Sequence, residues 1–230
     1  MMYPIHERFA TFQGEGLFMG MAAFFVRTYG CPVHCPWCDS AGTWHHDWVP
    51  KGIEKLSAEA LVVEAQEAKM AMMVVTGGEP TILDLEPLTS VCHHVPMQVH
   101  LETSGGFVIR GSFDWITLSP KRWKLPLRAN VALANEIKIV VENPEDIDCY
   151  YSILLDLGLA DSDCCEAIWL HPEWSKQRDP IVLNAISAAV KREEGIFRAG
   201  WQIHKLYRVD ALDPGSRPLV PLGGDSKLGY

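Results

Sequence analysis

Three cysteines lie close together near the amino-terminal end of the sequence, at Cys31, Cys35 and Cys38. Thiolates are soft ligands, and three of them within so short a segment can surround one metal ion or one iron–sulfur cluster. A structural zinc site would need a fourth ligand. Three nearby histidines are candidates for it: His34, His45 and His46. The cysteines alone therefore leave a closed zinc site and a cluster with an open coordination position as alternatives.

The order of residues around these cysteines favours the cluster. Three residues separate the first two cysteines, two separate the last two, and the aromatic Trp37 comes directly before Cys38. This pattern resembles the signature of the radical S-adenosylmethionine superfamily, in which three thiolates hold a [4Fe–4S] cluster. The resemblance implies that the open iron binds S-adenosylmethionine and that an electron from the cluster splits this cofactor to give a deoxyadenosyl radical. It also assigns Trp37, Cys38 and Asp39 to the cofactor site.

Two further motifs fit such a cofactor, and each follows an apolar run. In VVTGGEP, Gly78 permits close approach of a ligand to the backbone, and Glu79 suits a ligand ammonium group. A later run ends in Ser119, Pro120 and Lys121, where a hydroxyl beside a lysine can anchor a ribose or a carboxylate. Either motif alone is also an ordinary surface turn. The superfamily resemblance assigns both to S-adenosylmethionine binding.

The run TFQGEG near the amino terminus indicates which subfamily of the superfamily the sequence resembles. Gln13 and Glu15 flank Gly14. Their side chains offer hydrogen-bond donors and acceptors, and the glycine lets a ligand come close to the backbone. This combination suits the amide-like edge of a heterocycle. The same residues would also form a plain polar turn. Followed in order by FFVRTYGC, CDS, TGGEP, LETSG, SPK, NEIKIV and QIHK, the run resembles the 7-carboxy-7-deazaguanine synthase family from about residue 3 to about residue 205.

This second resemblance implies a substrate and a reaction. In that family 6-carboxy-5,6,7,8-tetrahydropterin is ring-contracted with loss of ammonia to a 7-deazapurine carboxylate, on the way to queuosine and related nucleosides. S-adenosylmethionine is regenerated. The resemblance implies eight substrate-binding residues: Phe12, Gln13, Gly14, Glu15, Arg27, Thr76, Glu102 and His204. Arg27 would pair with the substrate carboxylate through its bidentate fork, and Glu15 and Glu102 would read the amino and ring nitrogens of the pterin.

Some of these residues have structural alternatives. An arginine within an apolar strand needs a partner in any case, so the alternative for Arg27 is a buried structural ion pair, although we favour the substrate-binding role. The family also uses a magnesium ion, which is reached by the hydroxyl residue two positions after the last cluster cysteine, here Ser40. A serine there also suits a turn. Family members end soon after the His-Lys pair with a terminal segment that reaches the substrate, whereas this sequence continues beyond Lys205. The extension either folds away or replaces that contact, which bears on His204 as a substrate residue.

The elements that must position these residues are short apolar runs that alternate with helical patterns. Seven runs rich in β-branched and aromatic residues predict buried strands: AAFFVRTYG, MMVVTGG, QVHLETSG, DWITLSPK, EIKIVV, EAIWLHPE and FRAGWQIHK. Residues 57–69 and 180–194 are predicted helices, with Ser57 as N-cap and Pro180 in a first turn. This alternation predicts mostly parallel strands in a partial, incomplete TIM-like barrel of the radical S-adenosylmethionine type. Such folds place their chemistry after the carboxyl ends of strands, where the candidate motifs lie.

Length and composition indicate how the chain is organised into domains. The chain has 230 residues, of which 48% are apolar and 21% charged, as in a globular domain with a substantial core. We expect a core domain over residues 1–205 and a carboxy-terminal extension of unknown order over residues 206–230. The formal net charge of -9 opposes the positive field that a phosphate backbone requires, which argues against a nucleic-acid partner.

The sequence has no apolar segment of signal-peptide or membrane-span length, and its seven cysteines show no disulfide spacing. A cytoplasmic enzyme without a membrane partner is therefore expected. We expect the remaining cysteines to be small buried hydrophobes: Cys92, Cys149, Cys164 and Cys165. Trp169, His171 and Trp174 are expected in the core or at a dimer surface.

The family resemblance implies a homodimer that receives electrons from a donor such as flavodoxin or ferredoxin. Two alternatives stay open. A glycyl-radical-enzyme activase shares the cysteine spacing but acts on a protein backbone, and a zinc-binding module has no catalytic activity.

Overall fold

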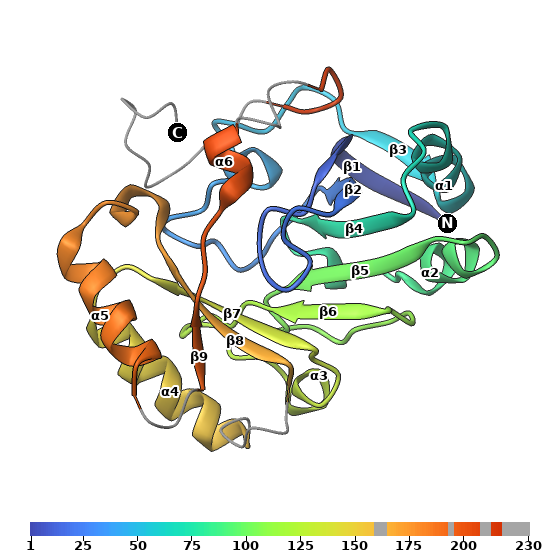
Figure 1. Ribbon diagram of the computed structural model, residues 1–230. Coiled ribbons are helices and arrows are strands. Elements are labelled where there is room, and N and C mark those ends of the chain that lie inside the picture. Colours follow the sequence, from blue (N-terminus) through green and yellow to red (C-terminus); the bar gives the residue numbers. More distant parts are fainter. Residues whose placement is uncertain (159–164, 193–195, 208–212, 218–230) are drawn as a thin grey trace.

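The computed structural model describes residues 1–158, 165–192, 196–207 and 213–217. Nine strands of this part form one sheet in the order β3-β1-β2-β4-β5-β6-β7-β8-β9, whose end strands are not paired with each other (Figure 1). The strands are β1 (Met2–Phe12), β2 (Ala22–Thr28), β3 (Glu54–Ser57), β4 (Met72–Gly77), β5 (Gln98–Thr103), β6 (Trp115–Leu118), β7 (Glu136–Val141), β8 (Ala167–Pro172) and β9 (Phe197–Ala199). The order β2-β4-β5-β6-β7-β8-β9 is parallel throughout. The predicted partial barrel of mostly parallel strands is thus confirmed.

Helices cover the outer face of this curved sheet, as the positions of α1, α2, α4 and α5 in Figure 1 show. The helices are α1 (Ala58–Glu67), α2 (Glu86–His93), α3 (Arg128–Val131), α4 (Glu145–Leu157), α5 (Pro180–Val190) and α6 (Ile203–Tyr207). The two predicted helices are α1 and α5. Ser57 caps α1 by accepting the backbone N–H of Ala60 at 3.2 Å, and Pro180 opens α5. Both helices end two to four residues before the predicted boundaries.

Strand β7 shows how the two-residue alternation separates core from functional face. Ile137, Ile139 and Val141 are fully buried in the hydrophobic core beneath the helices. The intervening Lys138 and Val140 face the inner side of the sheet and line its cavity. A charged side chain within an apolar strand therefore lies on the inner face of the barrel, where function is expected.

Strands β1 and β3 were not predicted, and both pair in antiparallel fashion at one end of the sheet. The charged residues that obscure the apolar pattern of β1 find partners outside the strand. Arg8 forms ion pairs with Glu54 of β3 at 2.6 Å and with Glu64 of α1 at 2.8 Å. Because β1 precedes β2, the QGEG segment is the loop of a hairpin and not a turn before a first strand.

The last predicted strand, FRAGWQIHK, is divided in the structure. Strand β9 ends at Ala199, and Ile203–Tyr207 form α6, so the strand prediction was wrong for the second half of this run. The chain leaves the sheet at Gly200, whose missing side chain makes room for His171: a Cβ there would lie 2.2 Å from its Nε2. The backbone N–H of Ile203 then donates to Gly14 O at 3.0 Å. This contact with the hairpin loop explains why the second half of the run leaves the sheet although its apolar residues predict a strand.

Within the described ranges, no helix has the length and apolar character needed to cross a membrane. The predicted boundary at residue 205 falls inside α6. Beyond that helix, residues 213–217 lie against β1, where the backbone N–H of Ala10 donates to Asp213 at 3.3 Å. The other residues of the predicted extension lie outside the described part. Cys92 is buried, Cys149 and Cys165 are half-buried, and Cys164 is not among the described residues.

Candidate active site

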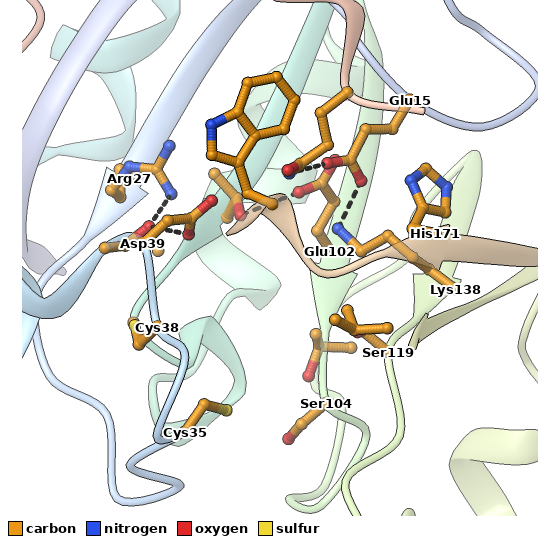
Figure 2. Close-up of a pocket in the computed structure, with 18 of the residues that line it drawn as sticks. Glu15, Arg27, Cys35, Cys38, Asp39, Glu102, Ser104, Ser119, Lys138 and His171 are labelled. Carbon is orange, nitrogen blue, oxygen red and sulfur yellow. Dashed lines mark hydrogen bonds and ion pairs between the residues drawn. The ribbon is translucent and has the colours of Figure 1, made fainter. Parts of the chain in front are cut away.

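A cavity of about 210 Å³ lies on the inner face of the sheet. It reaches the carboxyl ends of the parallel strands. Of the predicted site residues, all but Gly14 and Pro120 line it, although they come from segments spread over most of the chain. Figure 2 shows part of this wall, with Cys35 and Cys38 at one end and Glu15, Lys138 and His171 at the other. The structure thus brings the predicted residues together, while their individual roles stay predictions.

The three cysteines follow β2 in a loop at one end of the cavity. A zinc ion with four ligands at about 2.3 Å would bring neighbouring sulfurs to about 3.8 Å of one another. Among the described residues, the only group of three or more residues with metal-type ligand atoms within 4.8 Å of one another is His45, His46 and Asp47, which includes no cysteine. His34 is instead stacked on Trp44, with ring centroids 4.2 Å apart. The three sulfurs of the cysteine loop thus do not all lie within 4.8 Å of one another.

The thiols are partly shielded from solvent, and burial raises the pKa of Cys35 to about 11 and that of Cys38 to about 12. The Nε1 of Trp44 donates to the sulfur of Cys38 at 3.4 Å. Without a metal the thiols are therefore protonated at neutral pH, and ligation releases their protons. Three soft donors facing one cavity fit an iron–sulfur cluster.

The glycines after β4 pack against this loop. A Cβ at Gly78 would lie 2.3 Å from Gly30 O and 2.9 Å from the Cβ of Cys31. The backbone N–H of Glu79 donates to Gly30 O at 2.8 Å. The second glycine of the GGE motif thus serves, before any ligand is considered, to bring the β4 loop against the cysteine loop.

The Glu79 carboxylate is fully buried and already accepts several hydrogen bonds. Oε1 accepts from Thr81 and Thr103, and Oε2 accepts from the backbone and the hydroxyl of Ser104. These donors, from the segment after β4 and from the end of β5 and the loop after it, fix the carboxylate at the cavity wall. A ligand ammonium group at Glu79 would have to share oxygens that already have partners, and its role in cofactor binding stays a prediction.

Lys121 joins the loop after β6 to the cysteine end of the cavity. Its Nζ donates to the carbonyl and the hydroxyl oxygen of Ser119, each at 2.6 Å, and lies 5.2 Å from the ring centre of Trp37. Burial lowers the pKa of Lys121 to about 8. The predicted Ser119 and Lys121 are therefore one hydrogen-bonded unit, placed beside the aromatic residue of the cysteine motif.

The opposite end of the cavity is built by the hairpin loop after β1. The Nε2 of Gln13 donates to Glu102 Oε1 at 2.9 Å, and the hydroxyl of Thr76 donates to Glu102 Oε2 at 3.1 Å. Three predicted substrate residues, from the β1–β2 hairpin loop, β4 and β5, thus form one network. Glu15 lies beside it, and its two oxygens accept from Lys138 at 2.5 Å and from Gln202 at 2.6 Å.

Arg27 forms the ion pair that was the structural alternative for it, and it also lines the cavity. Its Nε donates to Glu7 at 2.6 Å, and Nη1 donates to the hydroxyl of Ser40 at 3.1 Å. Ser40 in turn donates to Asp39 at 3.2 Å. The predicted carboxylate binder and the predicted magnesium ligand are therefore in direct contact.

Helix α6 lies against the hairpin loop and contributes His204 and Lys205 to the cavity wall. Lys205, whose side chain is 1% exposed, forms an ion pair with Asp39 at 2.8 Å. The ring of His204 lies so close to Gly14 that a Cβ there would be 2.0 Å from Nδ1. Gly14 itself does not line the cavity, and its role is to make room for the predicted His204.

Sequence reasoning missed several cavity residues: Ser104, Lys138, His171, Trp174 and Gln202. His171 and Trp174 were expected in the core or at a dimer surface. His171 is indeed buried, but it lies at the cavity, and burial lowers its pKa to about 4. Lys138 could have been recognised, because a lysine in the middle of the apolar run EIKIVV must face a polar space.

Residues 12–144 match the family described as a 4Fe-4S single cluster domain. The chain is 47% identical over 146 residues to a 7-carboxy-7-deazaguanine synthase of Synechocystis, covering 64% of this chain and 68% of the relative. It is 33% identical over 236 residues to the 7-carboxy-7-deazaguanine synthase of Escherichia coli, covering 91% of this chain and 100% of that protein.

The fold has a solved counterpart. The crystal structure of QueE from Escherichia coli superimposes with a TM-score of 0.74 at 33% identity, covering 88% of this chain and 94% of that one. A relative of Flavobacterium psychrophilum, also named 7-carboxy-7-deazaguanine synthase, is 33% identical over 210 residues, or 90% of this chain and 93% of its own.

Proposed function

The chain belongs to the 7-carboxy-7-deazaguanine synthase family of radical S-adenosylmethionine enzymes, and from this premise we propose that it converts 6-carboxy-5,6,7,8-tetrahydropterin to 7-carboxy-7-deazaguanine. The substrate and the product differ by one molecule of ammonia, so the reaction needs no net oxidant, and S-adenosylmethionine is regenerated. The observation that carries the proposal is the single cavity in which the cysteine loop and the QGEG hairpin face each other.

The cofactors of the family are a [4Fe–4S] cluster and S-adenosylmethionine, which together supply the radical that starts the reaction. In the proposal the cluster is held by Cys31, Cys35 and Cys38. S-adenosylmethionine is held by Trp37, Cys38, Asp39, Gly78, Glu79, Ser119, Pro120 and Lys121. The hydrogen-bonded unit of Ser119 and Lys121 beside Trp37 supports this assignment, because it offers an ammonium group and an aromatic face at the cysteine end of the cavity.

The substrate would occupy the other end of the cavity. The residues proposed to bind it are Phe12, Gln13, Gly14, Glu15, Arg27, Thr76, Glu102 and His204. Arg27 is charged and preoriented by Glu7, which suits a substrate carboxylate. Gln13 and Thr76 donate to the Glu102 carboxylate and hold it in a fixed orientation, in which it can accept ring or amino N–H groups of the substrate.

A magnesium ion at Ser40 is also part of the proposal. The hydroxyl lies between Arg27 and Asp39, so an ion there would be close to the group proposed to bind the substrate carboxylate. Hard oxygen ligands from substrate and water would complete its coordination. We further propose a homodimer in a reducing compartment, the cytoplasm, with flavodoxin or ferredoxin as electron donor. The free cysteines of the ligand motif support the compartment.

Activity measurement tests the proposal. Anaerobically reconstituted protein is incubated with dithionite, S-adenosylmethionine, Mg²⁺ and 6-carboxy-5,6,7,8-tetrahydropterin, and the product is identified by mass spectrometry. We expect 7-carboxy-7-deazaguanine and ammonia in equal amounts. A reduced protein that cleaves S-adenosylmethionine but yields no deazapurine would contradict the substrate and would favour a glycyl-radical-enzyme activase.

Metal content separates the enzyme from a zinc-binding module. Protein purified without oxygen should be brown and contain about four irons per chain. Replacing any one of Cys31, Cys35 and Cys38 with alanine should remove the iron, whereas the buried Cys92→Ala should retain it. Colourless protein with one zinc per chain would contradict the cluster.

A further inference from the structure

Lys138 is a charged residue of the cavity to which the family resemblance assigned no role. It lies in the middle of β7 and faces the inner side of the sheet. Figure 2 shows its side chain pointing toward the carboxylates of Glu15 and Glu102. Its Nζ lies 2.5 Å from Glu15 Oε2. An ammonium group is thus placed beside two carboxylates at the end of the cavity opposite the cysteines.

The hydrogen-bonding capacity of Lys138 exceeds what the described residues use. An ammonium group has three N–H donors. Within the described ranges, the Lys138 ammonium donates to Glu15 alone, whereas the Lys121 ammonium donates to two oxygens of Ser119. Lys138 therefore has donors to offer to a molecule that enters the cavity.

Charge and exposure both suit contact with a ligand. Glu15 and Glu102 hold the pKa of Lys138 above its usual range, so the group stays an ammonium at neutral pH. Its side chain is 17% exposed, compared with 1% for the ion-paired Lys205. Because this exposed surface faces the cavity, a ligand can reach it.

An ammonium donor beside carboxylate acceptors is the complement of a cyclic amide edge, which presents a carbonyl oxygen next to an N–H group. We propose that Lys138 binds the carbonyl oxygen of the substrate's pyrimidinone ring and thereby selects 4-oxo heterocycles over 4-amino ones. This inference rests on the proposed pterin substrate. An amino group in the same place would point its own N–H donors at the ammonium, which leaves both groups without an acceptor.

Two stable ligands that differ at this one position test the proposal: pterin-6-carboxylate, which has a 4-oxo group, and 2,4-diaminopteridine-6-carboxylate. Equilibrium binding of each is measured on the reconstituted enzyme with S-adenosylmethionine. The wild type should prefer the oxo ligand by about 10- to 100-fold, the range expected for a hydrogen bond to a charged group. Lys138→Met should lose most of this preference. Lys191→Met, at the exposed end of α5, is the matched control and should retain it.

A purely structural role for Lys138, neutralising Glu15, predicts a different result in a double variant. Removing Lys138 alone leaves Glu15 as a buried charge without its ion pair, which can disturb the fold. The comparison of Glu15→Gln with Glu15→Gln/Lys138→Met avoids that problem, because neither protein has an isolated Glu15 charge. Glu15→Gln should bind both pteridines more weakly, because Glu15 is itself a proposed substrate residue, but the ratio of the two affinities should still favour the oxo ligand. The double variant should lose this ratio.

The outcomes separate this inference from the proposed function. Equal oxo preference in Glu15→Gln and the double variant, or an unchanged preference in a folded Lys138→Met, would overturn the role of Lys138 and leave the substrate in place. A wild type that binds neither pteridine would overturn the proposed substrate, and the role of Lys138 with it. Thermal unfolding of each variant verifies that the protein is folded.

Discussion

The Nε of Arg27 donates to Oε1 of Glu7 across 2.6 Å, where the Glu7 side chain is 4% exposed and that of Arg27 is 14% exposed. Glu7 also accepts the backbone N–H of Arg217, from the segment that lies against β1. The guanidinium is therefore held in one orientation at the cavity wall before a ligand arrives. Such preorganisation reduces the entropy lost on binding, so the ion pair and a substrate-binding role for Arg27 are compatible.

Replacing Arg27 with alanine should separate these two roles. We expect substrate affinity to fall by about 10- to 100-fold, because a charge-assisted hydrogen bond to the carboxylate is lost. We also expect the free energy of unfolding to fall by about 3 kcal/mol, because Glu7 becomes a buried charge without its partner. Binding titrations and chemical denaturation measure the two effects.

The double variant Arg27→Ala/Glu7→Gln is the control for this experiment. It should recover much of the stability and none of the substrate affinity. Iron content and cleavage of S-adenosylmethionine without substrate should stay at wild-type levels in both variants. Loss of cofactor cleavage would mean that Arg27 supports the cofactor site itself.

Gly14→Ala should displace α6 from the hairpin loop, because a Cβ at that position would lie 2.0 Å from His204 Nδ1. A shift of about 1 Å in a binding group can lower a rate by about 100-fold, and we expect a loss of this size in kcat/KM. Gly52→Ala is the matched control, since nothing lies within 4 Å of its Cβ position. Equal kcat/KM values for the two variants would show that contact between α6 and the hairpin is dispensable.

Ser40→Ala should raise the Mg²⁺ concentration needed for half-maximal activity by about tenfold, the effect of losing about 1.4 kcal/mol of binding free energy. Ser40→Thr restores a hydroxyl and should behave like the wild type. Activity measured as a function of Mg²⁺ concentration tests this, with iron content as a check of the cluster. Unchanged Mg²⁺ dependence in Ser40→Ala would leave Ser40 as a hydrogen-bonding partner of Arg27 alone.

His100 should make the fold sensitive to acid. It is buried on β5 against Phe18, with ring centroids 4.5 Å apart, and burial lowers its pKa to about 4. In the unfolded chain the pKa is about 6.5, so between pH 6.5 and 4 the unfolded state binds more protons and stability falls as the pH falls. The full effect is about 3 kcal/mol.

Chemical denaturation at several pH values measures this dependence. His100→Phe, which keeps an aromatic ring without a titrating group, should lose less stability than the wild type between pH 6.5 and 4.5. His46→Gln, at an exposed position, should follow the wild type. Parallel curves for His100→Phe and the wild type would contradict the assignment.

The sequence by itself determined the parallel part of the sheet and the residues that gather at its carboxyl edge. Both depend on short-range order: β-branched runs separated by helices predict parallel strands, and a motif that directly follows such a run must lie at the same edge as the others. This is why the cysteine loop, the GGE motif and the Ser119–Lys121 pair could be placed in one site without knowledge of the structure.

Tertiary structure alone decided which of these residues interact, and how the cavity is closed. Lys138 and Glu15 are 123 positions apart, and Lys205 and Asp39 are 166 apart, so no local pattern links either pair. Side-chain alternation predicts that Lys138 faces the inner side of β7. Its partner, however, comes from the β1–β2 hairpin, which was not predicted because the charged residues of β1 obscure its strand pattern. Long-range pairing is set by packing of the whole chain, and this packing places Arg27, Glu15 and Lys138 in the wall of one cavity.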